Sequence, residues 1–188
     1  TGTIATLYAE AGLTNLEITM NTEAAAETIT ALAEALGDRL NIGAGTVCSV
    51  SDLETALAAG AQFIVTPVLN EDIIKACANS NIPVFPGAYT PTEIYRAWSL
   101  GASMVKVFPA TQLGPAYIRE VLGPLNHIRL LPTGGVHLDN FHHFLDAGAK
   151  GLGIGGHLFP KHLIEQDNWD ELRSGFSAFV NKYRRWRG

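Results

Sequence analysis

The chain alternates short apolar runs with longer stretches whose apolar residues recur at helical spacing. Ile4, Leu7, Tyr8 and Ala11 predict an opening helix that ends at Gly12. Strands are predicted at residues 16–20, 41–43, 63–66, 83–85, 104–108, 129–131 and 151–154. Helices are predicted at 22–36, 51–60, 70–78, 90–100, 115–122, 139–147 and 168–183. This alternation predicts an α/β fold with a parallel sheet.

The way the helices end predicts a ring of repeated units. Several of them close on related turns before the next strand, namely Glu-Ala-Gly-Leu, Leu-Ala-Ala-Gly-Ala, Ser-Leu-Gly-Ala and Asp-Ala-Gly-Ala. Ser51 and Glu54 are expected to form a capping box for the helix that ends at Gly60. Seven strands behind an opening helix predict one domain over residues 1–188, a (β/α)8 TIM barrel whose first strand is absent from this chain. A doubly wound open sheet is the alternative, and the lack of a Gly-x-Gly-x-x-Gly turn disfavours it.

Composition narrows the classes of function. The chain has 188 residues, 47% apolar and 16% charged, as in globular proteins. Its net charge of −5 and the lack of an internal basic run argue against a nucleic-acid partner. No apolar run reaches the roughly 20 residues of a membrane span, so no membrane partner is expected. Cys48 and Cys77 are interpreted as reduced thiols of a cytoplasmic protein, with a disulfide as the alternative.

One charge interrupts a strand that is otherwise apolar. Lys106 lies in the run Met-Val-Lys-Val-Phe-Pro, which is typical of a parallel strand covered on both faces. Burial disfavours the ammonium form and lowers the pKa of a lysine. The neutral amine is a nucleophile that forms Schiff bases with carbonyl compounds. The alternative is a structural lysine, either ion-paired or with its stem along the barrel and its head in water.

A second lone charge that we expect to be buried, Glu17, lies in the predicted strand Leu-Glu-Ile-Thr-Met. Pairing of Glu17 with Lys106 across the barrel interior would offset the desolvation of both groups. A purely structural pair is the alternative, but such a pair often stabilises no more than apolar packing does. We therefore favour a functional pair, in which Lys106 forms the imine and Glu17 moves protons.

Other candidate binding residues gather where the predicted strands end, which is where barrel enzymes place their sites. Thr46 follows the strand at 41–43, and Thr66 and Pro67 end the strand at 63–66. These positions are expected to line the site of a small-molecule substrate.

Two glycine pairs follow the last two predicted strands. They are Gly134-Gly135 and Gly155-Gly156. Main-chain N–H groups there, helped by a helix N-terminus, are expected to bind phosphate. His157 could contact the same anion, or simply begin a helix. The expected ligand is a phosphorylated carbonyl compound.

From Gly12 to Phe159 the chain resembles the KDPG/KHG aldolases, the 2-keto-3-deoxy-6-phosphogluconate and 4-hydroxy-2-oxoglutarate aldolases. The resemblance rests on six segments in order: Leu-Glu-Ile-Thr-Met-Asn-Thr, Ile-Gly-Ala-Gly-Thr-Val, Val-Thr-Pro, Phe-Pro-Gly-Ala-Tyr-Thr-Pro-Thr-Glu, Val-Lys-Val-Phe-Pro-Ala and Leu-Pro-Thr-Gly-Gly-Val.

The resemblance implies a class I aldolase, a lyase that needs neither metal nor cofactor and assembles as a homotrimer of (β/α)8 barrels. It would cleave a phosphorylated 2-keto-3-deoxy sugar acid to pyruvate and glyceraldehyde 3-phosphate. By the same resemblance Lys106 is the Schiff-base lysine, Glu17 the general acid/base and Thr46 a contact to the pyruvyl part. The phosphate site would use Gly134, Gly135 and Gly156.

Two residues depart from the family pattern. Asn21 stands where the best-known members carry an arginine at the carboxylate end of the substrate. The residue is therefore expected to affect which substrate is preferred, and KHG and the galactonate analogue are candidates. His157 stands where many members have a serine near the phosphate. Two other functions stay open: a non-catalytic phosphosugar-binding barrel, and a phosphosugar epimerase or isomerase.

Overall fold

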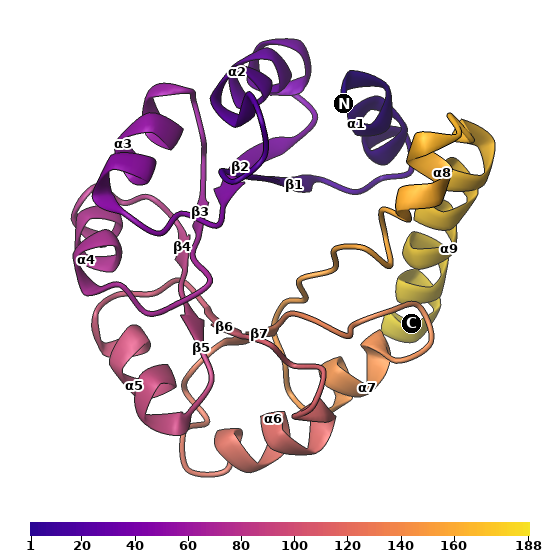
Figure 1. Cartoon of the computed structure of the whole chain (residues 1–188). Helices are drawn as coiled ribbons and strands as arrows, with labels where there is room; N and C mark the ends of the chain where they lie inside the picture. Colours follow the sequence, from indigo (N-terminus) through magenta and orange to yellow (C-terminus); the bar gives the residue numbers. More distant parts are fainter.

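The computed structural model describes residues 1–188, and its helices form a ring around two parallel sheets (Figure 1). The strands are β1 (Asn15–Thr19), β2 (Asn41–Gly45), β3 (Ile64–Val65), β4 (Val84–Phe85), β5 (Gly87–Ala88), β6 (Val105–Val107) and β7 (Leu130–Pro132). The helices are α1 (Gly2–Glu10), α2 (Ala25–Leu36), α3 (Val50–Ala58), α4 (Glu71–Asn79), α5 (Pro91–Ser99), α6 (Gly114–Leu122), α7 (Phe141–Asp146), α8 (Lys161–Glu165) and α9 (Trp169–Arg187). None of these helices combines the length and the hydrophobicity of a membrane span.

The strands pair in chain order. One sheet has the order β1-β2-β3-β4 and the other β5-β6-β7, and every pair is parallel. Pro86 separates β4 from β5, which lie on one continuous segment, because proline has no N–H to donate to the ladder. The Pro86 carbonyl still accepts from the Lys106 N–H at 2.9 Å, so the second sheet continues where the first ends.

The parallel α/β prediction is confirmed, but the structure does not show a closed barrel. The predicted strand at 151–154 is reduced to one bridge between Gly153 and Thr133. No strand pairing joins this bridge to β1, so the hydrogen-bonded ring is open there. The doubly wound alternative is wrong, because the helices lie outside the strands and none fills the interior of the ring (Figure 1).

Two predicted helix starts are wrong for local reasons. Helix α2 begins at Ala25 and not at residue 22, because Ala24 has a left-handed backbone with φ of 52°. The capping box of α3 uses Ser49 and Asp52 in place of the predicted Ser51 and Glu54. The Asp52 carboxylate also accepts from the Cys48 N–H at 2.9 Å.

An aromatic cluster joins the first and last helices. Tyr8 of α1 stacks on Phe159 with ring centroids 5.8 Å apart and meets Phe176 of α9 edge-on at 5.4 Å. The Tyr8 hydroxyl donates to the Asn15 carbonyl at 2.6 Å, which also ties α1 to β1. Burial raises the pKa of Tyr8 to about 12. The buried apolar residues form one continuous cluster, which includes Tyr8 and Phe176.

Candidate active site

Lys106 is held at the centre of β6. Its residue exposure is 7%, and its two strand neighbours, Val105 and Val107, are fully buried. The Nζ atom lies above the Phe108 ring, 4.7 Å from its centroid, where the ring face attracts a positive charge. No carboxylate lies within 4.0 Å of this nitrogen. The amine is therefore buried without a direct ionic partner.

Glu17 reaches along the sheet toward the end of β2. In the register of β1 and β2 it lies opposite Gly43, two residues before Gly45. Its carboxylate occupies the space that a Cβ on Gly45 would fill. The glycine at 45 therefore gives the Glu17 side chain its place inside the ring, and a glycine within a strand often marks such a close approach.

Glu17 and Lys106 influence each other through charge alone. Burial lowers the pKa of Lys106, and the negative charge of Glu17 partly offsets that effect. Burial also raises the pKa of Glu17, and the positive charge of Lys106 partly offsets it. The predicted burial of Glu17 is wrong, because the residue is exposed within β1; the surrounding protein nevertheless removes enough water to disfavour the carboxylate. The lowered pKa favours the neutral amine that a nucleophile requires, and the raised pKa makes the Glu17 carboxylate a stronger base.

The distance between Glu17 and Lys106 helps to distinguish a structural ion pair from a functional pair. A structural ion pair requires direct contact between ammonium and carboxylate, and there is none within 4.0 Å. The absence of that contact argues against the structural pair and leaves the functional reading.

We expect the nucleophilicity of Lys106 to develop below the pH range of an ordinary lysine. The amine reacts only when neutral, and its lowered pKa means that the proton leaves at lower pH. The measurement is acylation of Lys106 against pH, followed by peptide mapping. The midpoint should fall below about 10.4, the usual lysine value. A midpoint at or above that value would show an ammonium stabilised by its surroundings and would contradict the activated amine.

Thr46 stands out by its backbone. It follows β2 directly, is half-buried and has φ of 56°. A β-branched residue in this left-handed region costs about 1–3 kcal/mol, and such strain is concentrated at functional sites. Its neighbour Gly45 is the residue that receives Glu17, so Thr46 lies at the same end of the sheet as the carboxylate.

Thr66 and Pro67 pack against the segment that precedes Lys106. Thr66 is fully buried, and its hydroxyl donates to the Val68 carbonyl and accepts from the Gly87 N–H at 3.4 Å. The Pro67 carbonyl fills the space beside Gly87, which is the register partner of Lys106. These contacts hold the strand next to the lysine.

Asn21 lies in the connection between β1 and α2. Its side chain is exposed and makes no hydrogen bond within the protein. It is two residues past the end of β1, the strand that carries Glu17. Its amide is free for a ligand at this edge.

The glycine pairs form turns with free donors. Gly134 and Gly135 have φ of 94° and 72°, which glycine adopts without strain. The N–H groups of Gly134, Gly135, Gly155 and Gly156 donate no backbone hydrogen bond. Gly135 packs on Thr111, which follows β6, so this turn lies beside the loop of the lysine strand.

The predicted help from helix N-termini is wrong. Helices α7 and α8 have only six and five residues and begin several residues beyond the glycine turns. Short helices have weak dipoles, whose effect falls off within one turn. Free main-chain N–H groups are therefore the donors at these turns.

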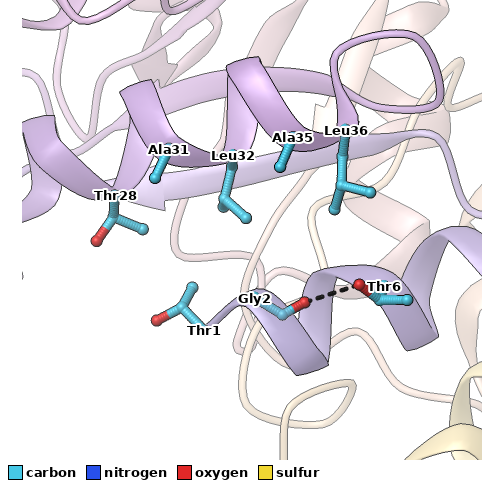
Figure 2. Close-up of a pocket in the computed structure, with 8 residues that line it drawn as sticks. All are labelled: Thr1, Gly2, Thr6, Thr28, Ala31, Leu32, Ala35 and Leu36. Carbon is cyan, nitrogen blue, oxygen red and sulfur yellow. Dashed lines mark hydrogen bonds between the residues drawn. The ribbon is translucent and has the colours of Figure 1, made fainter.

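A separate pocket of about 530 Å³ lies between α1 and α2 (Figure 2). Its lining contains no acidic, basic or imidazole side chain and consists of Thr1, Gly2, Thr6, Thr28, Ala31, Leu32, Ala35 and Leu36. It includes none of the residues predicted for the site. We therefore place the chemistry at the strand ends and not in this pocket.

Two residues of the site escaped the sequence analysis. Gly45 makes room for the Glu17 carboxylate, and Phe108 places its ring beside the Lys106 amine. The signal for Gly45 was present, because Gly-Ala-Gly is unusual inside a strand. Phe108 gave no signal, because an aromatic residue in an apolar strand is ordinary.

The chain is similar to known proteins in both sequence and structure. The family described as "Aldolase: KDPG and KHG aldolase" matches residues 2–174. The chain is 40% identical over 171 residues to the 2-dehydro-3-deoxy-phosphogluconate aldolase of Haemophilus influenzae, covering 90% of this chain and 80% of that protein. A solved structure described as native KDPGal is 31% identical with a TM-score of 0.91, covering 98% of this chain and 88% of the other.

A further solved structure bears on the chemistry. It is the KDPG aldolase of Legionella pneumophila with pyruvate captured as a covalent carbinolamine intermediate. It is 27% identical to this chain with a TM-score of 0.87, covering 94% of this chain and 86% of the other.

Proposed function

This chain belongs to the KDPG and KHG aldolase family, and from that membership we propose that it is a class I aldolase that cleaves a phosphorylated 2-keto-3-deoxy sugar acid to pyruvate and an aldehyde. The aldehyde would be glyceraldehyde 3-phosphate or a close analogue. The observation that carries the proposal is a buried, unpaired lysine coupled by charge to a nearby carboxylate.

The reaction would begin at the Lys106 amine. Its nitrogen adds to the C2 carbonyl of the substrate, and loss of water gives a protonated imine. The Glu17 carboxylate takes the proton of the C4 hydroxyl while the C3–C4 bond breaks. The electron pair of that bond moves into the imine to form an enamine, and the aldehyde leaves. Protonation at C3 and hydrolysis then release pyruvate and restore the amine.

The remaining predicted residues would either bind the rest of the substrate or support the strand that carries the lysine. Thr46 would contact the pyruvyl part, and Asn21 the edge near Glu17. Thr66 and Pro67 would support the strand beside the lysine. The phosphate would accept from the main chain of Gly134, Gly135, Gly155 and Gly156, with His157 beside them. The free N–H groups of these glycines support this assignment.

The test is covalent trapping. The protein is incubated with pyruvate and sodium borohydride, and the intact mass and peptide map are measured. A reduced pyruvyl adduct on Lys106 is expected. A folded protein that gives no adduct would rule out the imine reaction and leave a phosphosugar-binding barrel, or an epimerase or isomerase, in its place.

We expect Gly45→Ala to lower kcat/KM by more than its loss of folding stability explains. The new methyl group would occupy the place of the Glu17 carboxylate and push it away from the substrate. Gly43→Ala is the matched control, because its methyl group would meet the Phe63 ring instead. Overpacking costs about 1–3 kcal/mol in either variant. The role of Gly45 would be contradicted if the two variants lost the same kcat/KM for the same decrease in the free energy of unfolding.

Further properties follow from the family. We propose a single domain of the (β/α)8 type, supported by the ring of outer helices (Figure 1) and the continuous core. We also propose a homotrimer, for which the exposed apolar side chains of Val50, Val68 and Tyr95 are candidate contacts. Sedimentation analysis tests the trimer. A cytoplasmic location agrees with the free thiols of Cys48 and Cys77.

A further inference from the structure

A large aromatic side chain, Tyr89, lies at the rim of the ring beside the lysine strand. Tyr89 directly follows β5 and is 42% exposed, whereas Gly87 and Ala88 of that strand are buried. Strand β5 pairs with β6 in a register that sets Gly87 opposite Lys106. The Phe108 N–H donates to the Ala88 carbonyl at 3.0 Å, which carries the same register further and sets Tyr89 opposite Phe108.

The register also fixes the face of the sheet to which Tyr89 belongs. Side chains alternate along a strand, so residues two apart share a face, and residues opposite each other in neighbouring strands share it too. Lys106 and Phe108 are two apart, and the lysine amine lies 4.7 Å from the centroid of the Phe108 ring. Tyr89 therefore belongs to the face that carries the reactive amine, one strand away and nearer the rim.

Side chains of two helices hold the main chain of Tyr89 in place. Its N–H donates to the Glu93 carboxylate of α5 at 2.9 Å, and its carbonyl accepts from the Tyr117 hydroxyl of α6 at 2.6 Å. The Glu93 carboxylate also accepts from the Thr90 N–H at 2.7 Å. Burial raises the pKa of Tyr117, with further contributions from Glu93 and Tyr89, so its hydroxyl remains a donor at neutral pH. The position of Tyr89 is thus fixed although its side chain is exposed.

These contacts do not explain why residue 89 is a tyrosine. The hydrogen bonds that hold it use its main-chain atoms alone, so other residues could make them. The Tyr89 hydroxyl makes no hydrogen bond within the protein, and its ring pairs with no other aromatic ring. The phenol side chain is therefore available to a molecule that enters the ring.

The lysine strand has different neighbours on its two sides. Strand β6 lies between β5 and β7 (Figure 1), and the loop after β7 carries Gly134 and Gly135. A substrate that runs from Lys106 to these turns lies on the β7 side of the lysine strand. Tyr89 stands on the other side, where it limits how far such a substrate can bow away from β7.

We propose that Tyr89 is a specificity-determining residue that limits the length of the aldehyde part of the substrate. The proposal rests on the proposed function, since it concerns the same reaction. One end of a phosphorylated aldehyde is fixed at the Lys106 adduct and the other at the glycine turns, so an additional carbon makes the chain bow against the Tyr89 ring. Binding sites discriminate one additional methylene group by about 10- to 200-fold. The ring, and not the hydroxyl, makes this selection.

The test compares two aldehydes in the condensation with pyruvate: glyceraldehyde 3-phosphate, and erythrose 4-phosphate, which is longer by one carbon. The variants are Tyr89→Ala and Tyr89→Phe. Tyr183→Ala is the control, because Tyr183 is 41% exposed and lies on the outer helix α9. In Tyr89→Ala the ratio of kcat/KM for the longer to the shorter aldehyde should rise about tenfold, the lower limit of that discrimination. Tyr89→Phe keeps the ring and should keep the ratio of the parent protein, as should Tyr183→Ala.

The outcomes separate this proposal from the proposed function. Trapping of pyruvate on Lys106 does not involve the aldehyde and should be the same in all variants. With trapping intact, an unchanged ratio in Tyr89→Ala would overturn the role of Tyr89, and a simultaneous change in sedimentation would assign the residue to a subunit contact instead. An equal rise of the ratio in Tyr89→Phe would overturn selection by the ring. Failure of trapping in the parent protein would instead overturn the aldolase reaction.

Discussion

Lys106→Met is expected to abolish turnover and at the same time to raise the melting temperature. Methionine fills the space of the lysine stem in β6 and carries no charge to desolvate. Lys106 has no carboxylate within 4.0 Å, so its removal strands no salt-bridge partner. A gain of about 1 kcal/mol would raise the melting temperature of a domain of this size by roughly 2–4 °C.

The pH dependence of that gain has a definite sign. The folded pKa of Lys106 is lowered, so the unfolded chain binds this proton more tightly than the folded chain does. The destabilisation that Lys106 causes in the parent protein is therefore complete below the folded pKa of this lysine. It fades as the pH rises toward about 10.4, the usual lysine pKa. The advantage of Lys106→Met should shrink over the same range.

Thermal unfolding and an aldol-cleavage assay measure both effects. Lys75→Met is the control, because Lys75 is an exposed lysine 3.0 Å from Glu71, and such pairs contribute little. It should keep full activity and nearly the same melting temperature. Marked destabilisation by Lys106→Met at neutral pH would instead support a structural lysine, and a pyruvyl adduct elsewhere in that variant would displace Lys106 as the nucleophile.

Glu17→Gln is expected to lower kcat by about 10²–10⁴, the usual contribution of a general acid or base. Glutamine keeps the shape beside Gly45 but cannot take the proton of the C4 hydroxyl. The imine itself should still form, so borohydride with pyruvate should still label Lys106. Loss of turnover with retained labelling is the signature of a proton carrier.

A second measurement in Glu17→Gln tests the electrostatic coupling. The Glu17 charge raises the pKa of Lys106, so its removal should lower that pKa further and move the acylation midpoint to lower pH. Glu54→Gln on α3 is the control, since this exposed carboxylate is on the outer ring. An unchanged midpoint together with unchanged kcat would remove Glu17 from the mechanism.

The sequence predicted the order and type of most elements because local signals and tertiary packing agree there. The helices predicted at 70–78 and 90–100 are α4 and α5, and their N-caps are Asn70 and Thr90. The error at α3 came from equivalent local signals: Ser49 with Asp52 and Ser51 with Glu54 have the same spacing. Only the path of the chain out of β2, where the Cys48 N–H also meets Asp52, decides between them.

The sequence predicted the two charged residues of the site but not how they are arranged in space. Lys106 and Glu17 stand out because a lone charge in an apolar strand is rare. Their separation was not predictable, because it depends on the register of β1 with β2, which lets the Glu17 side chain lie over Gly45. Asn140 was likewise not predicted: it donates to the Gly135 carbonyl and accepts from the His137 N–H, within a loop that has no periodic pattern.

The contact between α1 and α9 has a consequence for how the protein is made. Tyr8 packs on Phe176, so the apolar side of α1 has its partner in α9, which is made after all the strands. The intervening units can pair one after another as they emerge, because within each of the two sheets every strand pairs with the one before it. Helix α1 must wait with its aromatic side uncovered until α9 has been made, which makes a nascent chain of this protein a substrate for chaperones that shield apolar surface.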